Sequence, residues 1–165
     1  MSTRSRIGMV QSDGSVKSIY CHWDGYPQNN GNILIEHYTD IEKVKSLIEL
    51  GSISSLGKNL NPDPIGGITI KFNLTDGFQN VPANGVHTFD NPQVDVTVAY
   101  HRDRGDEDLE ICIDDSESEF IKSDLGEWGY LFKDGKWFVI DAVSNVDERT
   151  LEVLDEEYIS KLTTT

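Results

Sequence analysis

The first two apolar-rich segments of the chain, Ile7–Val10 and Val16–Trp23, are interpreted as β-strands. Between them lies the pair Asp13-Gly14, which tolerates positive φ and predicts a tight hairpin turn. The second segment has to end before Pro27, because proline has no N–H group to donate to a sheet. The chain is therefore predicted to begin with a β-hairpin.

The period changes to that of a helix between residues 29 and 50. A first helix is predicted over Asn29–Tyr38 and a second over Asp40–Leu50. Thr39 is the predicted N-cap of the second helix, with Glu42 as its capping-box partner, and Gly51 is expected to end it. Together the two helices predict an α-hairpin.

Residues 52–92 are rich in Gly, Pro, Asn and Ser and look like an ordered loop that is too long for a simple connection, so the segment is either a functional loop or contains strands that the sequence does not reveal. The other predicted elements are a short strand Ile68–Phe72, a strand Val94–Tyr100 paired with Leu109–Ile113, an Asp-Gly hairpin of Trp128–Phe132 with Trp137–Ile140, and a helix Leu151–Leu162. We therefore expect one domain, residues 1–165, of the α+β class. Its architecture would be an antiparallel sheet of about five strands with an N-terminal α-hairpin insertion and a C-terminal helix.

Charge is unevenly distributed along the 165-residue chain, whose net formal charge is −15. Residues 1–60 carry six basic and six acidic residues, whereas residues 106–165 carry five basic and eighteen acidic residues, a net charge of −13. This acidic C-terminal third should repel nucleic acid and anionic membranes and attract basic surfaces. It is either a solvated face that maintains solubility or a surface for a basic protein partner. The candidate partner-surface residues are Asp106, Glu107, Asp108, Glu110, Asp114, Asp115, Glu117 and Glu119.

Composition argues against several other classes of protein. No apolar run approaches the roughly 20 residues of a membrane-spanning helix, and the N-terminal MSTRSRIGMV has too short an apolar part for a signal peptide. Cys21 and Cys112 lie far apart and are expected to be reduced thiols in a cytosolic protein. No C-x₂-C or H-x₃-H pair is present, so neither a metal site nor another cofactor is predicted.

Two clusters mix aromatic, basic and acidic residues: YCHWDGY at residues 20–26 and YHRDRG at residues 100–105. Strand alternation predicts that Cys21 and Trp23 face the core, while Tyr20 and His22 share the other face. His22 and Asp24 could form a hydrogen-bonded pair, but no nucleophile motif accompanies them, so no catalytic residue is assigned.

Arginines in and near these clusters suit an anionic ligand, and the aromatic rings suit a stacked base. The same arginines could instead pair with local acids at the rim of the sheet. The candidate ligand-binding residues are Arg4, Arg6, Tyr20, His22, Trp23, Asp24, Tyr26, His101, Arg102 and Arg104.

The segments TRSRIG, SIYCHWDGYP, LIEHY, KVKSLIELGSISSLG, YHRDRG and YLFKDGKWFVI together resemble a widespread family of small, uncharacterised proteins encoded by bacteriophages and prophages. The resemblance covers most of the first sixty residues and two later islands. It implies a phage-encoded protein located in the cytoplasm of the bacterial host. It also implies an accessory role such as host takeover or evasion of host defence.

These observations lead to three functional hypotheses. The first is a non-enzymatic phage accessory protein, a host-takeover or anti-defence inhibitor whose acidic surface imitates nucleic acid and binds a host protein with a basic surface. The second is a small-ligand binder that sequesters an anionic nucleotide signal through the arginine and aromatic clusters. The third is an enzyme that uses His22, Asp24 and His101, for which the sequence indicates no substrate.

Overall fold

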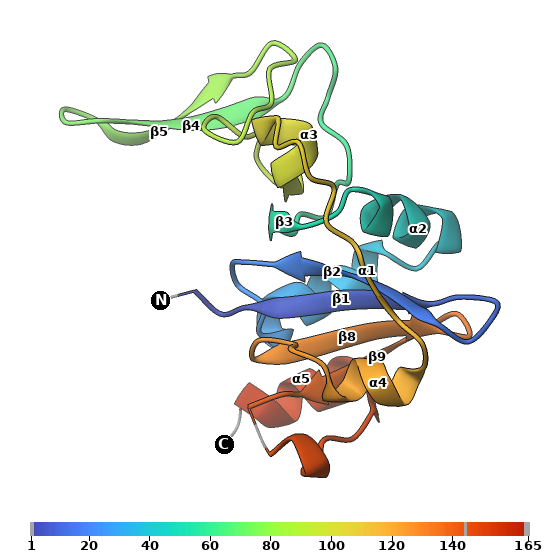
Figure 1. Ribbon diagram of the computed structural model, residues 1–165. Helices are drawn as coiled ribbons and strands as arrows, with labels where there is room; N and C mark the ends of the chain where they lie inside the picture. The colour runs from blue at the N-terminus through green and yellow to red at the C-terminus, as the bar shows by residue number, and fades with distance from the viewer. Residues whose placement is uncertain (1, 144, 164–165) are drawn as a thin grey trace.

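The computed structural model describes residues 2–143 and 145–163, which form a mixed α/β fold (Figure 1). Its strands are β1 (Ser5–Val10), β2 (Val16–Cys21), β3 (Ile53–Ser55), β4 (Ile68–Asn73), β5 (Gly77–Pro82), β6 (Val98–Ala99), β7 (Cys112–Asp114), β8 (Trp128–Lys133), β9 (Lys136–Asp141) and β10 (Glu152–Val153). Its helices are α1 (Asn32–His37), α2 (Ile41–Glu49), α3 (Tyr100–Arg104), α4 (Glu117–Lys122) and α5 (Glu156–Thr163), with a π-helical turn η1 (Pro27–Gly31) and a 3₁₀ turn η2 (Val146–Glu148).

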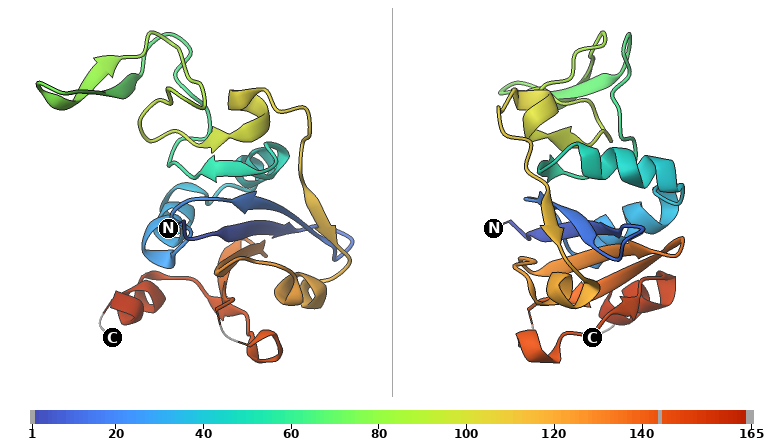
Figure 2. Two further views of the ribbon diagram at one scale, coloured as in Figure 1. Left: turned by 60° about the vertical axis from the view of Figure 1, so that its left-hand side comes forward. Right: turned by 45° about the vertical axis from the view of Figure 1, so that its right-hand side comes forward.

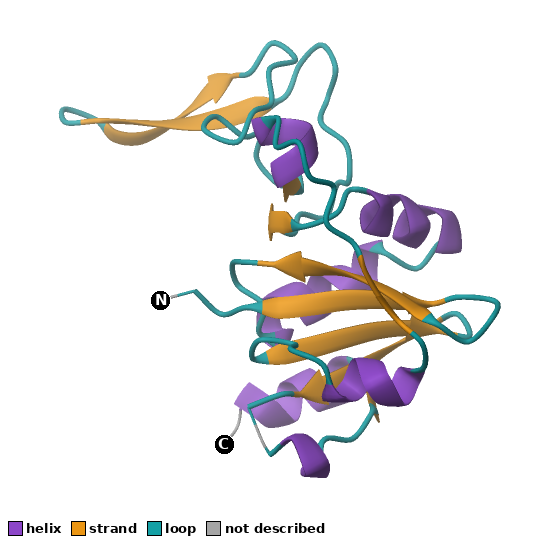
Figure 3. Ribbon diagram, in the orientation of Figure 1, coloured by secondary structure: helices purple, strands orange, loops and turns teal. Residues whose placement is uncertain are grey.

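The main sheet has eight strands in the order β10-β9-β8-β1-β2-β3-β6, with β7 also paired to β2. The two predicted hairpins, β1–β2 and β8–β9, form the centre of this sheet. Figure 3 shows their strands, coloured orange, side by side. They are joined by a parallel pairing of β1 with β8, and β2 also runs parallel to β3. The α+β class is therefore confirmed, but the expected antiparallel sheet of about five strands is wrong, because the sheet is larger and mixed.

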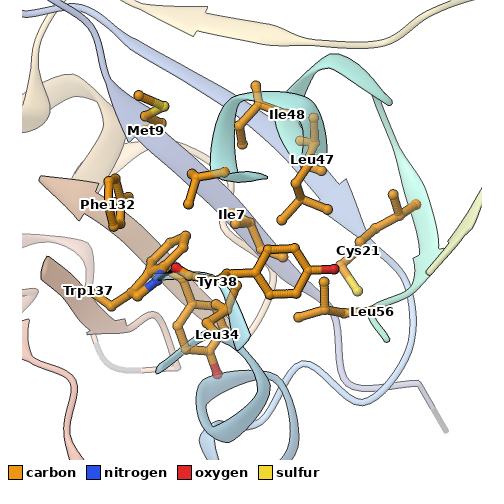
Figure 4. Close-up of a cluster of buried hydrophobic side chains, with 14 of the residues drawn as sticks. Ile7, Met9, Cys21, Leu34, Tyr38, Leu47, Ile48, Leu56, Phe132 and Trp137 are labelled. Atoms are coloured by element: carbon orange, nitrogen blue, oxygen red, sulfur yellow. Dashed lines mark hydrogen bonds between the residues drawn. The ribbon is translucent and has the colours of Figure 1, made fainter. Parts of the chain in front are cut away.

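Helices cover both faces of this sheet. On one face, Ile7 and Met9 of β1 pack with Leu34 of α1 and Leu47 of α2 (Figure 4). On the other face, Phe120 of α4 packs with a smaller buried group. Alternation along β8 explains the division: Tyr130 and Phe132 face the larger cluster and Leu131 the smaller one.

The predicted α-hairpin is present between β2 and β3 as η1, α1 and α2. Leu34 and Tyr38 are fully buried, as the helical spacing indicated. The predicted N-cap is wrong, because the Asp40 side chain, not that of Thr39, accepts the hydrogen bond from Glu42 N. Asp40 is as good a capping residue as Thr39, so the sequence alone did not separate the two.

The segment between residues 94 and 114 differs most from the prediction. Of the predicted strand Val94–Tyr100, only Val98–Ala99 is a strand, and the following residues form α3. The later strand, β7, pairs with Val16–Ser18 of β2 and not with residues 94–100. The C-terminal helix begins later than predicted, at Glu156, after the short strand β10.

The predicted loop of residues 52–92 contains strand β3 and a complete two-stranded hairpin, β4–β5. Apart from β6, which pairs with β3 in the main sheet, residues 58–105 form a second part of the molecule above that sheet, here called the upper lobe (Figure 1). The β4–β5 hairpin, here called the arm, projects from this lobe, as Figure 1 and the left view of Figure 2 show. No helix in the described ranges combines the length and apolar composition that crossing a bilayer requires.

Candidate functional site

The YCHWDGY cluster lies where β2 ends. Cys21 is fully buried, and burial raises the pKa of its thiol to about 11, so it is a protonated core residue as predicted. Trp23 is 44% exposed, which makes its predicted core position wrong. Strand β2 ends at Cys21, so the alternation of a strand no longer decides where Trp23 points.

His22 is part of a small aromatic group. Its Nδ1 lies 2.7 Å from the Tyr20 hydroxyl, and its ring meets the Trp23 ring edge-on at a centroid distance of 4.7 Å. In the described part of the chain the His22 ring is hydrogen-bonded to Tyr20. The predicted pairing of His22 with Asp24 is therefore wrong. Asp24 instead takes a left-handed backbone conformation with φ of 54°, at the start of the turn into η1.

Two residues of YHRDRG form a structural brace inside the upper lobe. The Asp103 carboxylate accepts hydrogen bonds from Ala99 N at 2.7 Å and from Arg102 Nε at 2.8 Å. Arg102 also donates to the carbonyl oxygens of Leu60 at 2.9 Å and Thr97 at 2.6 Å. Its guanidinium is thus used to tie three segments of the lobe together rather than to face a ligand.

The brace extends to His87, which lies 3.1 Å from Asp103 and is almost completely buried. The backbone N–H of Gln93 donates to His87 Nδ1 at 2.9 Å. Since Nδ1 accepts, the neutral ring must carry its proton on Nε2, and Nε2–H donates to Asp103. His87 is therefore a neutral link in the brace.

Arg104 has a different role, because it lies outside this brace. Its guanidinium makes two hydrogen bonds of 2.8 Å to the Asp106 carboxylate, which lower the pKa of Asp106. It also stacks over the rings of Tyr100 and Phe89, with its Cζ 4.7 and 4.8 Å from their centroids. The side chain is held at the boundary between the upper lobe and solvent.

The two clusters meet at one cavity of about 390 Å³. Tyr20 of β2 enters from the main sheet, and Tyr100, His101 and Arg104 enter from α3. Burial raises the pKa of both tyrosines, so their phenols stay neutral well beyond physiological pH. The rest of the lining is Ser52, Asp106, Glu107, Asp108 and Glu110.

Negative charge is in excess around this cavity. Of its four carboxylates, Asp106 is paired with Arg104, and Glu110 accepts a hydrogen bond of 3.3 Å from the Ser52 hydroxyl. Glu107 and Asp108 are exposed and make no interaction with another residue of the described chain. A cation would therefore be attracted to this cavity and an anion repelled.

Three of the ten candidate ligand-binding residues line this cavity: Tyr20, His101 and Arg104. Arg4 pairs with Glu127 at 3.7 Å, and Arg6 donates to the Ser18 hydroxyl at 3.3 Å. The other members, His22, Trp23, Asp24, Tyr26 and Arg102, do not line it. Of the four candidate arginines, only Arg104 lines this cavity, so the four do not converge on one ligand there.

The candidate partner surface has two parts. Its first four residues, Asp106 to Glu110, line the cavity just described. The other four belong to β7, α4 and the turn between them, where Glu119 accepts a hydrogen bond from Asp115 N and Glu117 pairs with Lys133 at 3.0 Å. Burial raises the pKa of Asp114.

Sequence reasoning missed Ser52 and Tyr100 as lining residues of this cavity. Tyr100 begins the YHRDRG motif and could have been found there, whereas Ser52 follows the end of a helix without any distinguishing pattern. No group of three or more His, Cys, Asp or Glu residues in the described ranges is arranged to hold a metal ion.

The fold and the cavity define a mixed α/β protein with an acid-rimmed, aromatic-walled cavity between its main sheet and its upper lobe. No family model, curated protein or solved structure matches the chain. Membership of the phage and prophage family thus stays a prediction from the sequence motifs.

Proposed function

We propose that this protein is a non-enzymatic accessory protein of a bacteriophage that binds a basic segment of a host protein at the acid-rimmed cavity. The excess of carboxylates around the cavity is the observation that carries the proposal. A Lys or Arg side chain entering it would meet Glu107, Asp108 and Glu110, while Arg104 is already neutralised by Asp106. Charge-assisted hydrogen bonds from an ammonium or guanidinium group to these carboxylates would hold it there.

The aromatic walls support the same proposal. Cationic side chains bind over the faces of aromatic rings, and Arg104 already lies in this way over Tyr100. Tyr20 supplies a second ring in the same cavity, held by its hydrogen bond with His22. An incoming basic side chain would lie against the Tyr20 ring and donate to the acids of the rim.

The rest of the acidic third would provide a wider contact. Residues 106–165 carry a net charge of −13, and Asp114 and Asp115 continue the acidic surface beyond the cavity. A basic surface that normally binds the phosphates of nucleic acid would be attracted to such a distribution. Inhibition of a host nucleic-acid-binding protein, during takeover of the host or evasion of its defences, is the role we propose.

The contacts of the arginines favour this proposal over capture of a nucleotide. Arg102 is bound to carbonyl oxygens and Asp103, and Arg104 is bound to Asp106. A phosphate entering the cavity would need to displace Asp106 and approach three further carboxylates.

Fluorescence anisotropy with an arginine-rich labelled peptide tests the proposal, with an uncharged Gly-Ser peptide as the reference. Binding should weaken steeply as NaCl rises from about 50 to about 500 mM, because screening shortens the range of the attraction. The triple variant E107Q/D108N/E110Q should bind at least about tenfold more weakly than the wild-type protein.

The matched control is D147N/E148Q/E156Q, which removes the same charge from exposed positions outside the cavity lining. It should keep most of the affinity. Equal losses in the two variants would mean that net charge alone attracts the peptide, and the cavity proposal would then fail. A rise in melting temperature with nucleotides but not with the peptide would favour the nucleotide hypothesis instead.

A further inference from the structure

The arm presents an apolar face that the described chain leaves open to solvent. In the register of the hairpin, Ile70 lies opposite Asn80 and Phe72 opposite Phe78, so these side chains share one face. Phe72 is 59% exposed and Phe78 77% exposed, and their ring centroids are 5.0 Å apart. Leu74, in the turn, is 96% exposed. The central strands β1 and β8 of the main sheet, by contrast, bury apolar side chains such as Ile7, Tyr130 and Leu131 under helices.

The arm is attached to the upper lobe only near its base. Val94 N donates to Ile68 O at 2.7 Å, and Thr69 forms a bridge with Gln93. Beyond these contacts it extends away from the rest of the chain (Figures 1 and 2). An isolated two-stranded hairpin is marginally stable in water and needs a surface to pack against. The exposed aromatic face therefore indicates an interaction surface.

The charge of the arm distinguishes among possible occupants. Residues 68–82 contain one basic residue, Lys71, and one acidic residue, Asp76, and are therefore neutral in a chain of net charge −15. A basic partner would find no excess of acid there, and the single Lys71 would give an anionic membrane little attraction. A second copy of this chain offers the same neutral, apolar face.

We propose that two copies of this chain associate by packing the apolar faces of their arms together about a two-fold axis. Such an interface is self-complementary, since each copy contributes the same patch. Because the arm projects from the lobe, the contact also keeps the two acidic thirds away from each other. Phe72, Phe78 and Leu74 would form the centre of this interface, where aromatic side chains contribute most.

Sedimentation equilibrium of the full chain tests this proposal directly. The wild-type protein should reach twice the mass of one chain, and the dimer should strengthen as NaCl increases, because salt screens the repulsion between two chains of charge −15. The variant F72S/F78S should dissociate at least about tenfold more readily. The control V143S removes an apolar side chain that is 71% exposed outside the arm, and it should dimerise as the wild type does.

Cross-linking provides a second measurement that leaves Phe72 and Phe78 of the apolar face in place. In a C112S background, N80C lies on the apolar face and should yield a cross-linked dimer, whereas Q79C lies on the opposite face and should not. A wild-type protein that stays monomeric at every concentration would overturn the proposal, as would equal cross-linking at the two positions. The proposed peptide binding weakens with salt while the dimer strengthens, so either one can fail without the other.

Discussion

In the main sheet the interior consists of apolar side chains packed between strands and helices, whereas in the upper lobe the most connected buried groups are polar. The fully buried residues of largest volume, such as Tyr130, Phe120 and Leu131, all lie outside the upper lobe. In the lobe, buried Gln93 binds Asp63 N through its side-chain oxygen and two carbonyl oxygens through its side-chain nitrogen. Apolar packing tolerates small shifts in geometry, but a hydrogen-bonded brace requires every partner to be in place.

This contrast explains why the lobe can support an exposed arm and one wall of a cavity. Asp103, Arg102 and His87 hold its segments by directed bonds rather than by a large core. The main sheet with its helices is here called the body, and the connection of the lobe to it is equally specific. The Tyr38 hydroxyl donates to Gly57 O at 2.8 Å and lies 3.1 Å from the Thr97 hydroxyl.

The largest effect is expected from Phe120→Ala in the body. Phe120 of α4 is fully buried against the sheet, so its removal leaves a cavity and should lower the free energy of unfolding by roughly 3–5 kcal/mol. Urea denaturation followed by circular dichroism measures the change. The exposed Phe78→Ala is the matched control and should change the stability of the body by less than about 0.5 kcal/mol.

Asp103→Ala should break the brace of the upper lobe. It removes the acceptor of Ala99 N, Arg102 and His87, and we expect a loss of about 3 kcal/mol because Arg102 is left without its counter-ion. Hydrogen exchange should rise in residues 58–105 while protection of β1 and β8 persists. If β1 and β8 lose protection equally, the body and the lobe unfold as one unit.

Gly57→Ala should weaken the junction between body and lobe. A Cβ atom at this position would lie 2.5 Å from Asp95 O and 2.6 Å from Val96 C, and backbone atoms of that kind have little room to retreat. The expected cost is about 2 kcal/mol. Limited proteolysis should then cut near residues 57–58 faster than in the wild type. Gly14→Asn, in an open turn that tolerates positive φ, serves as the control.

The smallest effect concerns alkaline pH and Cys21. Below its ordinary pKa of 9.0 the thiol is neutral in both the folded and the unfolded chain, and its full contribution to stability is present. Above pH 9 the unfolded chain ionises first, since burial raises the folded pKa to about 11, so stability falls as pH rises through this window. Cys21→Ala should remove about 1 kcal/mol of the loss between pH 8 and pH 10. An unchanged slope would show that other groups cause the alkaline loss.

The parts of the fold that could be predicted are those with a regular apolar period. Both Asp-Gly hairpins and the two helices after β2 were predicted because alternation, helical spacing and turn residues agree within each segment. The β4–β5 hairpin was only half predicted, as Ile68–Phe72. Its second strand, Gly77–Pro82, lacks strict alternation and includes a proline.

The sequence predicted some residues of the site but not how they are brought together. The sequence indicated that Tyr20, His101 and Arg104 belong to clusters of functional character and that residues 106–110 are strongly acidic. It did not indicate that these two features line the same cavity. The sequence also suggested Arg102 as a ligand-binding residue. Its guanidinium instead donates hydrogen bonds to Asp103 and to two carbonyl oxygens.

By itself, then, the sequence determined the two Asp-Gly hairpins, the helices after β2, the core character of Cys21 and the concentration of negative charge near the C-terminus. These depend on residue type and on spacing over a few positions, which any single segment records. Only the tertiary structure decided the parallel β1–β8 pairing, the brace of Asp103 and the meeting of Tyr20 with α3. Those contacts join residues far apart along the chain, and they form only when the apolar faces of separate elements are buried together.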